Sequence, residues 1–160
     1  MRQLRFFALL GALMLGASLV QCQQLTIETG AGKPTVFTRA DIEALPHSKI
    51  TTGTGDSQNT YDTVSLRAVL EKAGVAFDKS LSGKRMASCL LVEAADGYRV
   101  VIALPELDPA FTDKQVALAF LKDGKPLDEK EGPYRIVIPD EKRMARWVRQ
   151  VTTLKIVDVP

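Results

Sequence analysis

Short runs that alternate apolar and polar residues, each followed by a turn signal, constrain the fold of this 160-residue chain most strongly. Such runs are typical of β-strands with one buried face, and Asp-Gly pairs between them favour tight hairpins. The pattern predicts strands over residues 24–30, on both sides of Asp96-Gly97, on both sides of Asp123-Gly124, and over residues 134–139 and 152–159.

Two segments have helical patterns instead. Thr38 followed three residues later by Asp41 is a capping-box pattern, and Pro46 predicts the end of that first helix. Residues 64–75 carry apolar side chains at helical spacing and end at Gly74. The polar, glycine-containing stretch 49–62 is predicted to be a loop, with room for a short strand at its start. Together these elements predict a mixed α+β domain that is richer in strand than in helix.

The N-terminus has the pattern of a secretory signal peptide. Arg2 and Arg5 precede an apolar run that is too short to span a bilayer comfortably. We therefore expect residues 1–22 to be a leader, residues 23–160 to form one domain, and the mature protein to be periplasmic. A lipoprotein anchored at Cys22 ranks second, because Gln21 stands where a small residue is normally required. The two arginines are not adjacent, so we expect export of the unfolded chain.

Composition excludes several classes of function. The 21 basic residues lose Arg2 and Arg5 with such a leader, which leaves 19 against 19 acidic residues, so no general attraction to nucleic acid is expected. A single histidine, His47, and the scattered acids supply neither a zinc ligand set nor a Ser-His-Asp triad. Cys89 lies in an apolar run and is predicted to be a small core residue. No catalytic or metal-ligating residue is assigned.

One segment, residues 132–151, gathers arginines around the only tryptophan of the chain. Arginine grips phosphate or carboxylate with a planar fork and stacks on rings, and tryptophan offers a face to a heteroaromatic ligand. The segment therefore suits a flat ligand, an anionic ligand or both. An alternative stays open, in which these arginines pair with nearby acids and the tryptophan lies in the core. The residues concerned are Arg135, Asp140, Glu141, Lys142, Arg143, Arg146, Trp147 and Arg149.

Residues 61–75, 94–104 and 116–157 resemble, in order, the sulfite-oxidase-like molybdopterin-binding domain. That family has an aromatic residue before a helix, an Asp-Gly-Tyr strand, a strand ending in Asn-Gly-x-Pro-Leu, and a Gly-x-Pro-hydrophobic-Arg strand followed by a basic segment. The resemblance covers roughly residues 34–158 and implies this family's strand-rich fold. It also implies that a pterin, possibly molybdopterin, contacts Tyr61, Tyr98, Arg135, Arg143, Arg146, Trp147 and Arg149.

The chain departs from the family at two positions that matter for chemistry. In the enzymes of the family, a cysteine in the loop before the helix ligates molybdenum, and the corresponding stretch 49–62 contains none. A thiolate anchors the ion and tunes its potential, so we expect no molybdenum and no redox activity. Glu131 also stands where a histidine often precedes the Gly-x-Pro step.

The chain is most similar to a group of small periplasmic members of this family that lack the cysteine. The resemblance implies a non-catalytic pterin-binding protein that relays pterin availability to a membrane-bound enzyme of cyclic di-GMP metabolism. Two alternatives remain: a molybdopterin-dependent oxidoreductase or a subunit of one, and a protein-interaction domain with a vestigial pocket.

Overall fold

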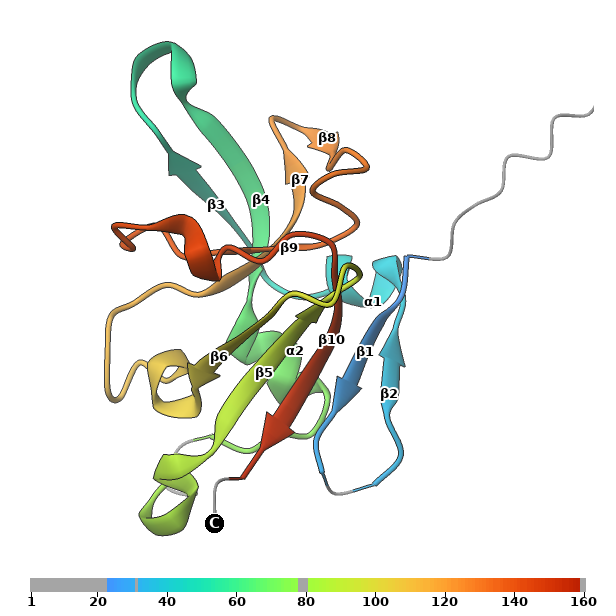
Figure 1. Cartoon of the computed structure of the whole chain (residues 1–160), viewed down its shortest axis with the longest axis vertical. Helices are drawn as coiled ribbons and strands as arrows, with labels where there is room; N and C mark the ends of the chain where they lie inside the picture. Colours follow the sequence, from blue (N-terminus) through green and yellow to red (C-terminus); the bar gives the residue numbers. More distant parts are fainter. Residues whose placement is uncertain (1–22, 31, 78–80, 159–160) are drawn as a thin grey trace, which may run out of the picture.

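Two β-sheets form the body of the molecule in the computed structural model, which describes residues 23–30, 32–77 and 81–158 (Figure 1). The predicted leader, residues 1–22, lies outside the described residues. The first sheet joins the two ends of the described chain, because β1 pairs with β10. These two strands are parallel, and the other strand pairs of this sheet are antiparallel. Its strands, in spatial order, are β2 (Thr35–Phe37), β1 (Leu25–Glu28), β10 (Val151–Val157), β5 (Cys89–Ala94) and β6 (Arg99–Ala103).

The second sheet is antiparallel and is built around β7, which pairs with three other strands. Its hairpin β3–β4 projects from the body at the top of Figure 1. The strands, in spatial order, are β3 (His47–Thr52), β4 (Asn59–Ser65), β7 (Ala117–Lys122) and β8 (Lys125–Pro126). A further strand, β9 (Arg135–Val137), also pairs with β7.

The helices are short and connect the strands. Thr38 caps α1 (Arg39–Glu43) in a complete capping box with Asp41, as predicted. The second helix, α2 (Leu66–Lys72), buries Leu66, Val69 and Leu70. The described residues also include short 3₁₀-helices: η1 (Gly55–Ser57), η3 (Gly83–Ala87), η4 (Leu104–Leu107) and η5 (Met144–Arg146).

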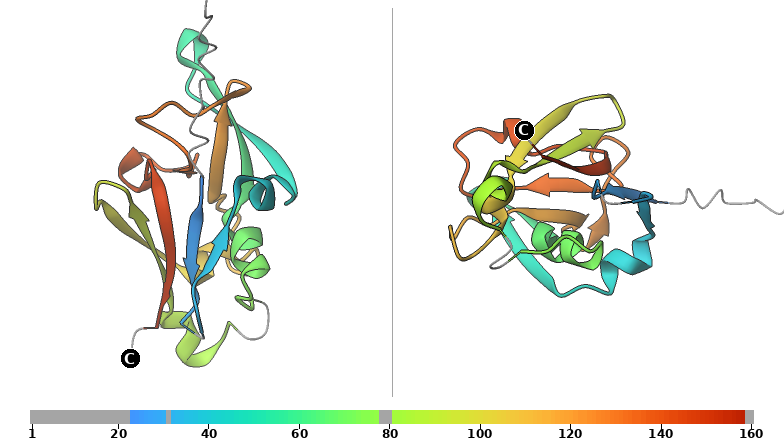
Figure 2. Two further views of the ribbon diagram at one scale, coloured as in Figure 1. Left: turned by 90° about the vertical axis from the view of Figure 1, so that its right-hand side faces the viewer. Right: turned by 90° about the horizontal axis from the view of Figure 1, so that it is seen from below.

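One hydrophobic core binds these layers together. In Figure 2, the two α-helices lie on the opposite side of the molecule from β5 and β10. Tyr134 and Phe120 are the largest fully buried side chains, and Leu154 of β10 is also completely buried. Within the described part of the chain, no helix has both the length and the apolar character needed to cross a membrane. The predicted strand-rich α+β fold is confirmed.

Three local predictions need correction. Residues 49–62, predicted to be a loop, belong largely to the β3–β4 hairpin. This hairpin projects into solvent and has few buried side chains, so its sequence lacks the alternation that reveals a half-buried strand. β7 buries Ala117 and Ala119 as well as the predicted alternate residues, because both of its faces are covered. Cys89 is half-buried rather than fully buried.

Candidate functional site

The arginine-rich segment folds back on itself. Tyr134–Ile138 is buried, the chain then loops out through η5, and it returns at Trp147 and Val148. The two arms of the loop are joined by backbone hydrogen bonds, from Ile136 N to Val148 O at 2.8 Å and from Val151 N to Tyr134 O at 2.9 Å. The segment is therefore a closed loop whose exposed part is Asp140 and residues 142–145.

The guanidinium of Arg135 lies beside two aromatic side chains, Tyr61 of β4 and Trp147 of this loop. Its guanidinium carbon is 5.6 Å from the centre of the Tyr61 ring and 5.5 Å from that of Trp147. The two rings meet edge to face, with centroids 6.4 Å apart. These distances are those of cation–π contacts, which are strongest where water is excluded. The side chain of Arg135 is only 10% exposed.

Glu131 supplies the negative charge that pairs with Arg135. Its Oε1 accepts a hydrogen bond from Arg135 Nη1 and lies 3.6 Å from Lys122 Nζ. Arg135 Nη1 also reaches Tyr61 Oη at 3.4 Å. The buried Nε of Arg135 has no hydrogen-bond acceptor among the described residues. A buried N–H without a partner is costly, and this atom has almost no exposed surface through which a ligand could reach it.

Trp147 lies in the core rather than on the surface. It is 5% exposed, and its indole N–H donates to the carbonyl oxygen of Ile138 at 3.0 Å. The structure thus places the indole behind Arg135, as the alternative interpretation of this segment expected. Trp147 supports the guanidinium and presents no open face of its own.

Arg146 is the centre of a second charged cluster. Its Nε donates to Glu141 at 2.7 Å and its Nη1 to Glu106 at 3.2 Å, while Lys114 Nζ donates to Glu106 at 2.9 Å. Burial alone would raise the pKa of Glu106, but the hydrogen bonds from Arg146 and Lys114 lower it to about 2. The hydrogen bond to Glu106 in turn raises the pKa of Arg146.

The other predicted residues lie at the surface. Tyr98 is 49% exposed, and its hydroxyl donates to the carbonyl oxygen of Ala145 at 2.8 Å, so it holds η5 against the start of β6. Arg143 and Arg149 are exposed and have no side-chain partner within the described part of the chain. The structure therefore brings Tyr61, Arg135 and Trp147 together, while the remaining predicted residues line the outside of the same loop.

Four charged residues of these clusters were not predicted as site residues. They are Glu106, Lys114, Lys122 and Glu131. Glu131 had attracted notice only as a departure from the family pattern. Glu106 and Lys114 are 40 and 32 positions from Arg146, and nothing local in the sequence connects them.

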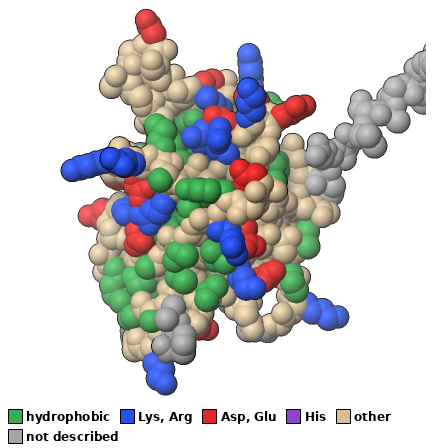
Figure 3. Space-filling model, viewed as in Figure 1, with side chains coloured by type: hydrophobic (Ala, Val, Ile, Leu, Met, Phe, Trp, Pro, Cys, Tyr) green, Lys and Arg blue, Asp and Glu red, His purple; other side chains and the backbone are tan. Residues whose placement is uncertain are grey.

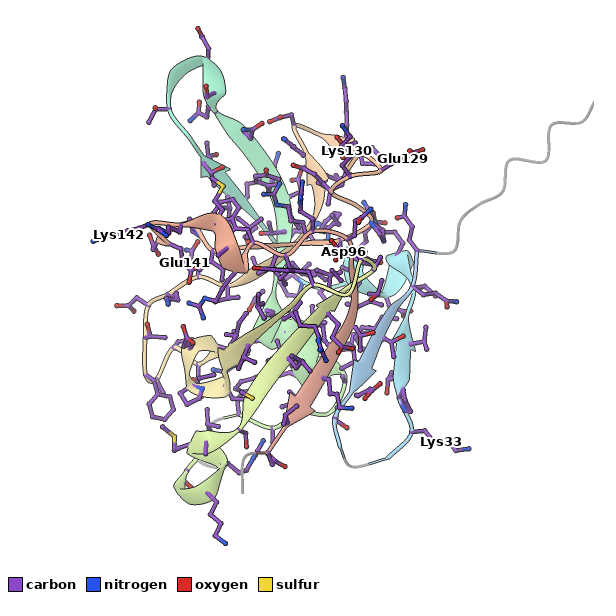
Figure 4. The ribbon with its side chains drawn as sticks, in the orientation of Figure 1. Lys33, Asp96, Glu129, Lys130, Glu141 and Lys142 are labelled. Carbon is purple, nitrogen blue, oxygen red and sulfur yellow. The ribbon has the colours of Figure 1, made fainter. Side chains whose placement is uncertain are left out.

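Acidic and basic side chains are interspersed on this face of the molecule rather than separated. Figure 3 shows red and blue side chains next to one another around η5 and β8. In Figure 4, Glu141 and Lys142 lie beside η5, and Glu129 and Lys130 lie beside β8. The site is thus one in which most charges are already compensated.

Two cavities lie near these clusters, and neither is lined by Tyr61, Lys122, Glu131 or Arg135. One of about 530 Å³ is lined by Gly132 and Pro133, directly after Glu131, and by Gln150. The other, of about 350 Å³, is lined by Lys114, Ile50 and Ser65. Both have the size of small-molecule sites.

The donor set does not include a metal site among the residues that the structure describes. No group of three or more His, Cys, Asp or Glu side chains there is placed to hold an ion. Cys89, the one described cysteine, begins β5 in the first sheet, whereas Tyr61 and Arg135 belong to the second. Among the described residues, no cysteine thiol therefore accompanies Tyr61 and Arg135.

Comparison with known proteins places this geometry in context. No curated protein matches the sequence. Among solved structures, the chain is similar to the sulfane dehydrogenase SoxCD from Paracoccus pantotrophus, with a TM-score of 0.64 and 23% sequence identity over 85% of this chain. The match spans 38% of that protein's chain. The model of the oxidoreductase molybdopterin binding domain matches residues 19–160. This chain therefore belongs to the oxidoreductase molybdopterin-binding domain family, the sulfite-oxidase-like molybdopterin-binding domains.

Proposed function

We propose that this protein binds a pterin at the Arg135–Tyr61–Glu131–Lys122 cluster and acts without molybdenum. The observation that carries the proposal is the cluster around the carboxylate of Glu131, which contacts the guanidinium of Arg135 and lies 3.6 Å from Lys122 Nζ, with the ring of Tyr61 near both cations. Family membership supplies the class of ligand.

The chemistry of the cluster fits a pterin in three ways. The guanidinium of Arg135 carries N–H donors for a ring nitrogen or for the 4-oxo oxygen. The carboxylate of Glu131 can accept from the 2-amino group and the ring N–H. Tyr61 and Lys122, 5.8 Å from the ring centre to Nζ, add an aromatic and a cationic contact. These residues would bind and orient the ligand, and Trp147 would keep Arg135 in position.

The absence of a cysteine from residues 49–62 supports binding without the metal. This stretch includes the tip of the β3–β4 hairpin, where Gly53 and η1 form a compact polar turn. A pterin would be held by hydrogen bonds and ring contacts only, so its binding would be reversible. Reversible binding suits a protein that reports the level of its ligand.

The signalling role is part of the same proposal. A leader over residues 1–22 would carry the protein to the periplasm, where it would meet a membrane-bound enzyme of cyclic di-GMP metabolism. The similarity of the chain to small family members of that kind supports this step. Co-purification of such an enzyme with the tagged protein, gained or lost on adding pterin, is the measurement that checks it.

An oxidoreductase subunit is the second candidate. It is favoured by the fold shared with sulfane dehydrogenase and by the family itself. Metal analysis of the protein purified from its native compartment separates the two candidates, because stoichiometric molybdenum would support the enzyme and contradict the signalling protein. A third candidate, an interaction domain with a vestigial pocket, predicts that neither pterin nor metal is bound.

Titration of the purified protein with oxidised and reduced pterins tests the main proposal. Trp147 is the only tryptophan and contacts Arg135, so its fluorescence should change on binding. Arg135→Met should weaken binding by about tenfold to a hundredfold, the effect of losing a charge-assisted hydrogen bond. Arg99→Met, a matched change at an exposed arginine of β6, should leave the affinity unchanged. Absence of binding to the wild-type protein in the high micromolar range would contradict the proposal.

A further inference from the structure

We infer that Glu131 determines the specificity of this site and makes it select pterins that carry no phosphate. The inference rests on the proposed function and specifies its class of ligand. It comes from the way in which the cations of the cluster are already paired, and it assigns a role to a residue that family membership does not explain.

Glu131 is held firmly in contact with both cations. Its carboxylate Oε1 contacts Arg135 and lies 3.6 Å from Lys122, and its side chain is only 15% exposed. The backbone is fixed as well, because Glu131 N donates to the Oδ1 of Asp128 at 2.9 Å and Glu131 O accepts from Gln150 N at 2.9 Å. The carboxylate therefore cannot move far when a ligand arrives.

This arrangement disfavours the binding of a phosphate group next to Arg135. A phosphate that approached Arg135 would meet the negative charge of Glu131 in a partly buried place, where like charges repel more strongly than in water. It could displace Glu131 only by leaving that carboxylate buried without its partner. Both outcomes weaken the binding of a phosphorylated pterin.

The second arginine cluster offers no substitute. Arg146 already donates to the carboxylates of Glu141 and Glu106, and Glu106 is further engaged by Lys114. A bidentate phosphate contact needs a free guanidinium fork, and Arg146 has none to offer without breaking these bonds. Figure 3 shows acidic side chains next to basic ones across the same face.

A pterin without phosphate finds complementary groups instead. The hydrogen bond from Arg135 and the closest approach of Lys122 both fall on Oε1 of Glu131, which leaves Oε2 to accept from the ligand. The 2-amino group and the ring N–H of a pterin are a neutral pair of donors suited to a carboxylate.

The test compares neopterin with neopterin monophosphate, two probes that differ only in the phosphate. Calorimetric titration of the wild-type protein at neutral pH should show about tenfold or more tighter binding of neopterin. Glu131→Gln should move this ratio by about tenfold toward the phosphate ester. Glu28→Gln is the matched control, since Glu28 is a carboxylate of β1 that pairs with Lys155 outside the cluster, and it should leave the ratio unchanged.

Each outcome decides the inference. Tighter binding of the phosphate ester by the wild-type protein would overturn it while leaving pterin binding intact, and so would an unchanged ratio in a folded Glu131→Gln variant. If that variant does not unfold cooperatively, Lys122→Met replaces it and should weaken the phosphate ester more than neopterin. Binding of neither probe to the wild-type protein would remove the proposed function and the inference together.

Discussion

At the scale of single residues, the arginines of one segment have different roles because their partners differ. Arg135 is buried beside two rings and opposite Glu131, Arg146 joins two carboxylates, and Arg149 is exposed at the surface. The segment thus contains both an arginine that we propose as a ligand contact and an arginine that pairs with nearby acids. Trp147 takes the core position, and the guanidinium beside it carries the chemistry.

The ionisation of Glu106 should make the free energy of unfolding depend on pH. Its folded pKa of about 2 lies below the ordinary value of 4.5, so its contribution is fully present above pH 4.5 and is lost as the pH falls toward 2. We expect Glu106→Gln to lower the melting temperature at pH 6. Because the folded pKa of Glu106 is about 2, this difference from the wild-type protein should shrink as the pH falls toward 2. Thermal unfolding followed by circular dichroism measures the difference at each pH. A difference independent of pH would show that the charge of Glu106 is not responsible.

At the scale of elements, the β3–β4 hairpin depends on backbone geometry at its tip. Gly53 has a φ of 82°, and a Cβ built there would lie 2.4 Å from the carbonyl oxygen of Ser57. Contacts that short do not occur between a Cβ and a backbone oxygen, so the tip would have to rearrange. Gly55, two residues on, has a φ of 56° but open space around it.

Gly53→Ala should therefore destabilise the protein more than Gly55→Ala does. Both variants place an alanine in the left-handed region, which costs about 1–2 kcal/mol, and only the first adds the clash. Urea unfolding of the two variants and the wild type measures the difference directly. Equal losses in both variants would mean that the hairpin tip relaxes without cost.

At the scale of the whole molecule, β10 joins the N-terminal and C-terminal parts of the described chain. It pairs in parallel with β1 on one side and antiparallel with β5 on the other. It also follows directly from the loop that carries Arg146 and Trp147. The strand that completes the first sheet thus anchors one arm of the site.

Leu154→Ala should test this dependence. Leu154 is fully buried at the centre of β10, and such a truncation costs about 2–5 kcal/mol. Thr153→Ala, on the other face of the same strand, should cost much less because Thr153 is only partly buried. Chemical denaturation gives both values, and a small loss in Leu154→Ala would show that the core collapses around the missing atoms.

The sequence by itself determined the local elements of this protein. The capping box at Thr38, the turns at Asp96-Gly97 and Asp123-Gly124, and the strands around them follow from side chains within a few residues of one another. The order of these motifs also indicated the family. Local propensity and turn chemistry act over such short separations, so they can be read along the chain.

Only the tertiary structure decided which distant side chains meet. Packing between segments far apart in sequence decides three features: the pairing of Arg146 with Glu106, the contact of Arg135 with the rings of Tyr61 and Trp147, and the strand character of the polar hairpin. Whether an arginine faces solvent, a carboxylate or a ring is set by the surfaces that the fold brings beside it. Burial and pairing of charge are properties of that three-dimensional neighbourhood, and no local pattern encodes them.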